Sequence, residues 1–177
     1  YKWKDDKRVE GLLFNYKHFY GSYDYVGDSH KWYRKEIRII RNDKKIHSYR
    51  DAQGFRKNEQ PLKVIPIDAS IYHYGWVKPP VQQQAKREAF EKLWHNDKEA
   101  EKRAPKKTEF DYSGIDSLKL FKDSHPQVMR KRIESKSWDF SFDTSRKNFS
   151  LKGRILFFIE KLTGWRIGEY KNYKLIG

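Results

Sequence analysis

Residues 62–80, LKVIPIDASIYHYGWVKPP, mark the point at which the sequence changes from strand-like to helix-like periodicity. The first part is rich in Ile and Val, which favour strands, and we expect a pair of strands around Pro66. Pro79 and Pro80 then suit the first turn of a helix. The stretch predicts an α+β fold, in which a small mixed sheet from about residue 9 to residue 74 precedes a helical C-terminal region.

Two further strands are predicted before this stretch. Residues 9–16, VEGLLFNY, form a short and mostly apolar run, and residues 35–42, KEIRIIRN, alternate charge with isoleucine. The segments between the strands, residues 21–30 and 48–61, are rich in Gly, Ser, Asp and aromatic residues. Such composition is typical of loops, so we expect strands that are joined by long loops.

A helical region is predicted after residue 80. Apolar residues recur there at helical spacing, which indicates an amphipathic helix packed on the rest of the protein. They are Val81, Ala85, Ala89, Phe90, Leu93 and Trp94. Residues 96–109 form a charged connector that Pro105 interrupts. A second helix is expected over residues 123–138, with Ser124 as its cap.

The C-terminal tail predicts a third helix, which ends at Gly164. Five apolar residues share one stripe of this helix: Leu151, Ile155, Phe158, Ile159 and Leu162. Basic residues surround the stripe, so the helix either docks on the core or lies on an anionic membrane surface. Leu156 and Phe157 broaden the apolar surface, which favours docking, with Trp165 and Tyr170 packed back as well.

Length and composition limit the classes of protein. The 177 residues can bury a core without disulfides or a structural metal. The net charge of +15 attracts phosphates of nucleic acid, anionic lipid or nucleotides, although a lysine-rich soluble surface gives the same number. The absence of cysteine excludes thiol nucleophiles and zinc–thiolate sites and favours a cytoplasmic location. No apolar run approaches the ~20 residues that span a bilayer.

The loops hold residues that could carry chemistry. No P-loop, GxGxxG, HExxH, GxSxG or D-x-D motif occurs. Aromatic residues instead interleave with Arg, His and one Asp, which suits a surface that stacks on a ring, holds phosphates and removes a proton. Each also has a structural explanation: the aromatics as core residues, His73 as a hydrogen-bonded histidine and Asp51 as a turn former. The candidates are Lys17, His18, Tyr20, Trp32, Tyr33, Arg34, Arg38, Arg41, Arg50, Asp51, His73, Trp76 and Lys78.

Four blocks, in order, resemble the second half of bacterial family 2 glycosyltransferases with the GT-A fold. They are residues 11–22 (GLLFNYKHFYGS), 32–42 (WYRKEIRIIRN), 49–56 (YRDAQGFR) and 71–80 (IYHYGWVKPP). The resemblance implies that residues 1–80 are the acceptor-side part of the glycosyltransferase domain and residues 81–177 a helical C-terminal extension. In that family a preceding half holds a divalent metal, Mn or Mg, through D-x-D. We therefore expect the chain to begin within a larger protein and to lack glycosyl transfer by itself.

The resemblance also implies roles for individual residues. Asp51 would be the catalytic base that deprotonates a hydroxyl acceptor, and His73 would contact the metal or the diphosphate of a nucleotide-sugar donor. We expect both to face one cleft, with Trp76 at its wall. Substrate-binding roles are implied for His18, Tyr20, Arg38, Arg50, Trp76 and Lys78.

The implied process is glycan or cell-surface polysaccharide synthesis, with a glycan or lipid-linked acceptor, in the cytoplasm or peripherally on the inner face of the membrane. Two other classes stay open: a basic nucleic-acid-binding module, which explains the charge and the aromatic residues, and a membrane-surface adaptor, which explains the tail. We also expect self-association, because a missing half would uncover a sheet edge and apolar surface.

Overall fold

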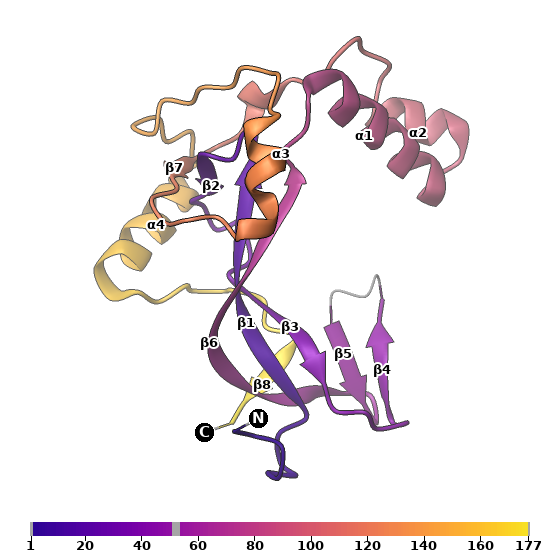
Figure 1. Ribbon diagram of the computed structural model, residues 1–177, viewed down its shortest axis with the longest axis vertical. Helices are drawn as coiled ribbons and strands as arrows, with labels where there is room; N and C mark the ends of the chain where they lie inside the picture. The colour runs from indigo at the N-terminus through magenta and orange to yellow at the C-terminus, as the bar shows by residue number, and fades with distance from the viewer. Residues whose placement is uncertain (1, 51–53, 177) are drawn as a thin grey trace. The chain divides into compact units, whose positions relative to one another are not determined.

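The computed structural model describes residues 2–50 and 54–176. Within these residues, a mixed eight-stranded sheet, mostly N-terminal, is followed by four α-helices, so the predicted α+β class is confirmed. Contacts divide the chain into two compact units: residues 1–17, 30–72 and 151–177 form the first, and residues 18–29 and 73–150 form the second. Strands β1 (Gly11–Tyr20) and β6 (Gln60–Trp76) contribute residues to both units (Figure 1).

The first unit pairs its strands in both directions. β3 runs antiparallel to β1, β4 and β5 form a hairpin, and β8 runs parallel to β6, which makes the sheet mixed. β5 and β6 meet through a tight turn in which Asn58 and Glu59 both have positive φ, the mirror-image turn that matches strand twist. The other elements of this unit are β3 (Lys35–Ile40), β4 (Ile46–Tyr49), β5 (Gly54–Lys57), α4 (Leu151–Thr163) and β8 (Tyr173–Leu175).

The core of the first unit lies on one face of these strands. Leu13, Ile37, Leu62 and Val64 form it, and all are 2% exposed or less. The pairing of β1 with β3 shifts register between Leu12 and Leu13, so β3 does not alternate regularly. Ile37 is consequently buried, whereas Ile39 is 51% exposed.

β6 corrects the expected pair of strands around Pro66. The structure has one strand of 17 residues that passes through this proline. Its parallel pairing with β8 covers Leu62 to Val64 and ends before Pro66. Proline lacks an N–H and cannot donate a hydrogen bond to a neighbouring strand. Pro66 lies beyond the residues that pair with β8, so no donor is needed on that side and the strand continues through it.

The second unit is built around aromatic side chains. The end of β1 pairs with β2, which pairs with β7. The ring of Phe19, fully buried, stacks on Tyr74 at 4.7 Å and meets Phe121 edge-on at 4.9 Å between ring centroids. Trp138 donates a hydrogen bond to the Gly21 carbonyl, 2.8 Å away. The remaining elements are β2 (Tyr25–Gly27), α1 (Pro80–Trp94), α2 (Asp97–Arg103), η1 (Tyr112–Gly114), β7 (Leu118–Leu120), η2 (Gln127–Met129) and α3 (Arg130–Glu134).

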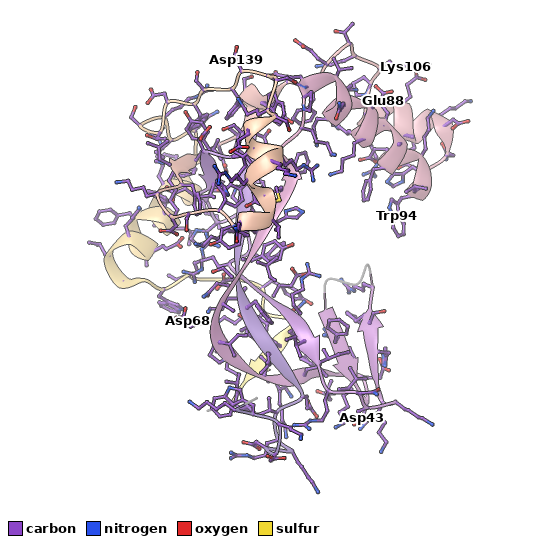
Figure 2. All side chains as sticks on the ribbon, in the orientation of Figure 1. Asp43, Asp68, Glu88, Trp94, Lys106 and Asp139 are labelled. Carbon is purple, nitrogen blue, oxygen red and sulfur yellow. The ribbon has the colours of Figure 1, made fainter. Side chains whose placement is uncertain are left out.

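Helix α1 begins at the prolines as predicted, but its packing differs from the prediction. Its buried side chains are Gln83 and Gln84, and Gln84 donates a hydrogen bond to the Pro105 carbonyl. The apolar residues expected to pack are exposed: Leu93 is 77% and Trp94 64% exposed, and Trp94 projects away from the ribbon (Figure 2). The helix therefore packs through a polar face, and its apolar face is open.

Helix α2 occupies the segment that was expected to be only a charged connector. The sequence contains the features that favour this helix. Asn96 caps the first turn by accepting a hydrogen bond from the Glu99 amide. Acidic residues lie in the first turn and basic residues in the last turn, where they interact favourably with the helix dipole. The expected second helix is shorter than residues 123–138. It consists of η2 and α3, and Pro126, not Ser124, occupies the N-cap position of η2.

Helix α4 ends before Gly164 as predicted, since Gly164 adopts φ +70° and its amide bonds to the Glu160 carbonyl. Docking of its apolar stripe is contradicted, because no residue of α4 is buried and Phe158 is 63% exposed. Trp165 and Tyr170 are also exposed, at 63% and 74%. Among the described residues, no helix is long and apolar enough to cross a membrane.

Candidate functional site

The first unit contains a cleft of about 870 Å³. It is lined by residues that precede and begin β3, by the facing ends of β4 and β5, by the first turns of α4 and by residues 166–173. Segments far apart in the sequence therefore meet here. The cleft lies within one compact unit, so its geometry does not depend on the other unit.

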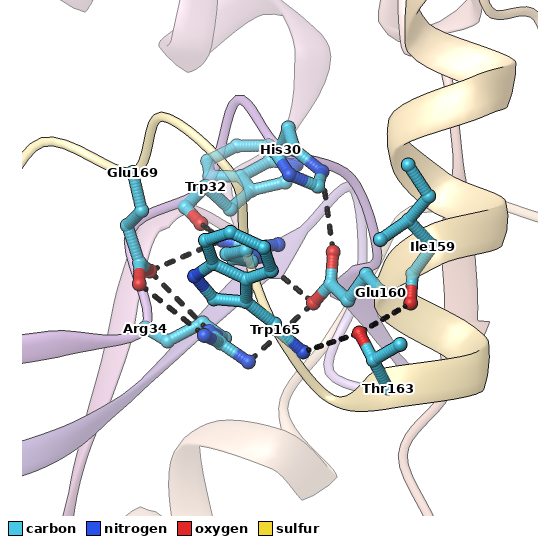
Figure 3. Close-up of polar contacts among 9 residues, drawn as sticks. His30, Trp32, Arg34, Ile159, Glu160, Thr163, Trp165 and Glu169 are labelled. Atoms are coloured by element: carbon cyan, nitrogen blue, oxygen red, sulfur yellow. Dashed lines mark hydrogen bonds and ion pairs between the residues drawn. The ribbon is translucent and has the colours of Figure 1, made fainter.

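An ionic network holds the tail that forms one wall (Figure 3). Glu160, on the inward face of α4, accepts a hydrogen bond from Arg166 at 2.8 Å and forms ion pairs with His30 at 3.2 Å and Arg34 at 3.5 Å. Glu169 accepts two hydrogen bonds from Arg34, at 3.3 and 3.2 Å. Two carboxylates thus neutralise two guanidinium groups and fix the residues after α4 against the loop before β3.

Arg166 is the most enclosed member of this network, with a side chain 6% exposed. It also donates to the Trp32 carbonyl, so backbone and side-chain acceptors surround its guanidinium. Thr163 supports the turn that leads to it, because its hydroxyl donates to the Ile159 carbonyl and accepts from the Trp165 amide. The wall is therefore a built feature of the fold.

The cleft carries more positive than negative charge. Among the described residues that line it, six are Lys or Arg and two are Glu. Arg34 and Arg166 are offset by Glu160 and Glu169, and the other four basic residues add net positive charge. These four are Lys31, Lys35, Arg50 and Lys152. Such a field favours phosphate or carboxylate groups on a ligand.

Four tyrosines add aromatic surface to the same cleft: Tyr33, Tyr49, Tyr170 and Tyr173. Tyr49 has the Arg56 guanidinium over its ring, 4.1 Å from the centroid, which holds that ring in place. Burial raises the pKa values of Tyr33 and Tyr173, so both hydroxyls keep their protons at neutral pH. The lining can thus present flat rings and neutral hydroxyls together with cations.

Glu36, on strand β3, is one of the residues that line the cleft. It is 6% exposed, and Arg38 donates a hydrogen bond to it at 2.6 Å while also reaching the Tyr16 hydroxyl at 3.1 Å. Burial raises the pKa of Glu36 above its ordinary value of 4.5, although Arg38 acts in the opposite direction. Its burial and the direction of its pKa shift make Glu36 a candidate general base.

The structure places four of the predicted site residues at or near this cleft: Tyr33, Arg34 and Arg50 line it, and Arg38 lies next to it. Arg50 lines it and has a positive φ of 55°. Arg38 reaches it through Glu36 and is 41% exposed at its side chain. Asp51, the predicted base, lies outside the described residues, so a cleft shared by Asp51 and His73 stays a prediction.

Lys17, Trp32 and Arg41 also belong to the first unit but are not among the residues that line the cleft. Five other predicted site residues belong to the second unit. The rings of His18 and His73 meet edge-on, with centroids 5.4 Å apart. Tyr20 lies 5.9 Å from Trp76 between ring centroids, and burial raises the pKa of Tyr20. The Lys78 carbonyl accepts a hydrogen bond from the Tyr112 hydroxyl. His18 and His73 thus form one aromatic pair, and Tyr20 and Trp76 form another. The Lys78 backbone makes its hydrogen bond just after the end of β6.

A metal ion does not fit the described residues of this chain by itself. No group of three or more His, Cys, Asp or Glu side chains is close enough among them to hold one. His18 and His73 are neighbours, but an edge-on pair of imidazoles supplies at most two ligands. The predicted metal contact of His73 therefore needs ligands from elsewhere and stays a prediction.

Several residues of the cleft were not singled out in the sequence. Glu36 was not singled out because its segment was interpreted as a regular alternation of charged residues and isoleucine. The register shift between β1 and β3 breaks that alternation. Tyr170 and Tyr173 stand in a tail whose path depends on the ionic network. A signal for that network was present, since Glu160 is the only acidic residue in helix α4.

The comparisons with known proteins found no relative: no family model, no curated protein and no solved structure matches this chain. The resemblance to glycosyltransferases accordingly rests on the four sequence blocks alone.

Proposed function

We propose that this chain is the acceptor-side part of a glycosyltransferase, which transfers a sugar from a nucleotide-sugar to a hydroxyl acceptor. The cleft of the first unit would hold the charged, sugar-bearing end of a substrate. The observation that carries the proposal is the combination, in one cleft, of basic side chains, tyrosine rings and a buried carboxylate.

The charge of the cleft supports an anionic substrate. Phosphate or carboxylate groups would lie near Lys31, Lys35, Arg50 and Lys152, which come from three separate parts of the lining. Charge-assisted hydrogen bonds that Lys or Arg donates to such groups are about twice as strong as neutral ones. Arg50 is of particular interest, because it lies directly before Asp51 in a block that resembles the family.

The rings support a sugar or another ring-bearing group. Tyrosines offer large amphipathic surfaces with a hydroxyl at one end, which suits a ligand with an apolar face and many hydroxyls. Tyr33 and Tyr170 stand on different segments of the lining. A sugar phosphate would therefore meet rings and cations in the same cleft.

Two carboxylates are candidates for the base that removes a proton from the acceptor hydroxyl. Asp51 is implied by the resemblance, and Glu36 by its burial and raised pKa. A base works best when its pKa is close to the working pH, and the environment of Glu36 moves its pKa in that direction. Glu36 would take the proton as the acceptor oxygen attacks the anomeric carbon, while the bond from that carbon to the diphosphate breaks and the nucleoside diphosphate leaves.

The proposal is tested by isothermal titration calorimetry with UDP-glucose, with free glucose and with a single-stranded dT20 oligonucleotide. We expect UDP-glucose to bind and glucose to bind at least tenfold more weakly. Arg50→Ala should weaken UDP-glucose about tenfold or more, since a hydrogen bond to a charged group contributes about 1.5–3 kcal/mol. Lys102→Ala, an exposed change in helix α2 of the second unit, is the matched control.

Tighter binding of dT20 than of UDP-glucose, falling steeply as salt rises, would favour a nucleic-acid-binding module instead. If the Arg50→Ala and Lys102→Ala variants bound UDP-glucose equally well, the claim that the cleft is the binding site would fail.

A further inference from the structure

Helix α4 has two faces of opposite character. Its inward face carries Glu160, which the ionic network holds, and the half-buried side chains of Leu156 and Phe157. Its outward face carries four apolar side chains at spacings of four, three and four residues, which brings them into one stripe. They are Leu151, Ile155, Phe158 and Leu162, exposed at 80%, 62%, 63% and 69%. The apolar stripe of this helix therefore faces solvent.

The charges of α4 are sorted in the same way. Lys152, Arg154 and Lys161 are exposed, and at 100° per residue they lie on the two flanks of the apolar stripe. The single carboxylate of the helix, Glu160, points inward and is paired. The outward surface of α4 thus presents apolar side chains bordered only by cations.

We propose that this outward face binds the surface of an anionic lipid bilayer. An apolar stripe bordered by Lys and Arg is the pattern of helices that lie in the interface plane, where the stripe enters the acyl boundary and the cations meet headgroups. Trp165, which is exposed just after the helix, is a residue type that favours the membrane interface. The inference does not depend on which ligand the cleft binds.

Charge complementarity decides among the occupants of this face. A second copy of the chain, joined by the same face, would bring the flanking cations of both helices together without an acidic residue to offset them. An anionic bilayer offers negative charge along both flanks and an apolar interior beneath the stripe. The ionic network keeps α4 fixed on its unit, so the face is presented as a rigid surface.

Vesicle sedimentation with the full chain tests the inference. We expect strong binding to vesicles of 70% phosphatidylcholine and 30% phosphatidylglycerol, and at least tenfold weaker binding to pure phosphatidylcholine. The variant with Phe158→Ser and Leu162→Ser should lose at least tenfold in binding to the anionic vesicles. Phe90→Ser with Leu93→Ser, an equally exposed apolar pair on α1, should bind as the unchanged chain does.

Charge reversal supplies the second arm. Arg154→Glu with Lys161→Glu should lower binding by more than tenfold, because each cation near an anionic leaflet contributes roughly fivefold. Lys98→Glu with Lys102→Glu on α2 is the control for net charge alone. Circular dichroism checks that every variant is folded.

Equal binding to neutral and anionic vesicles, no binding, or equal losses in the α4 and control pairs would overturn the inference. Dimerisation without lipid that Phe158→Ser with Leu162→Ser abolishes would do the same, because it would make a second copy the occupant.

Discussion

Replacement of Glu160 by Gln tests the network that builds the cleft wall. The change keeps the shape of the side chain but removes the charge that neutralises Arg166 and Arg34 and that faces His30. Removal of one partner from a buried ion pair costs about 3–5 kcal/mol. Glu160 keeps 19% of its side chain exposed, and Glu169 still faces both arginines, so a smaller cost of about 2–3 kcal/mol is expected.

The expected loss corresponds to a Tm about 4–12 °C lower, at about 2–4 °C per kcal/mol for a chain of this size. Thermal and urea denaturation followed by circular dichroism measure it. Glu99→Gln is the matched control, because Glu99 forms an exposed pair with Arg103 and should cost less than about 0.5 kcal/mol. Equal losses for Glu160→Gln and Glu99→Gln would refute the reasoning.

Three further predictions concern other parts of the chain. Burial lowers the pKa of His125 below its ordinary value of 6.5, so the unfolded chain binds the proton more tightly and the free energy of unfolding should fall as pH drops below 6.5. Urea denaturation at about pH 7.5 and pH 5.5 measures this loss, and His125→Phe should reduce it. A loss of the same size in the variant would contradict the prediction. Gly21→Ala should destabilise by about 1–3 kcal/mol, because Gly21 has φ +72° and the ring of Phe140 would lie 2.5 Å from the new Cβ, whereas Gly114→Ala meets nothing within 4 Å and serves as control. The chain should self-associate at high concentration through the open apolar face of α1, and Leu93→Glu should make it monomeric; light scattering that shows a monomer before the substitution would contradict this.

The sequence predicted the α+β class, the onset of helix at the two prolines and the end of helix at Gly164, because these depend on local chemistry. Prolines at a first turn and a glycine at a helix end act through their own backbone. The packing of the helices was not predictable in this way. Periodicity shows that a helix has an apolar face but not what covers it, so the exposed faces of α1 and α4 were both assigned to the core.

The cleft was predicted only in part, and the reason is long-range contact. Tyr33, Arg34, Arg38 and Arg50 were candidates from the sequence, whereas Glu36 depends on a register shift between two strands. Tyr170 reaches the cleft because Glu160 and Arg166 direct the tail, which couples residues far apart in the chain. The division of the chain at residue 80, the roles of Asp51 and His73 and the glycosyltransferase family stay predictions.

The most direct test of the central claim is to map UDP-glucose onto the ¹⁵N-labelled chain by two-dimensional NMR. The account predicts that saturable shifts gather at the amides of Tyr33, Arg50, Gly168 and Tyr170, from three separate segments that line the cleft. Arg50→Ala should weaken the titration about tenfold or more while leaving the pattern of shifts in place. Shifts confined to the second unit, or shifts scattered over exposed lysines without saturation, would contradict the claim that this cleft is the substrate site.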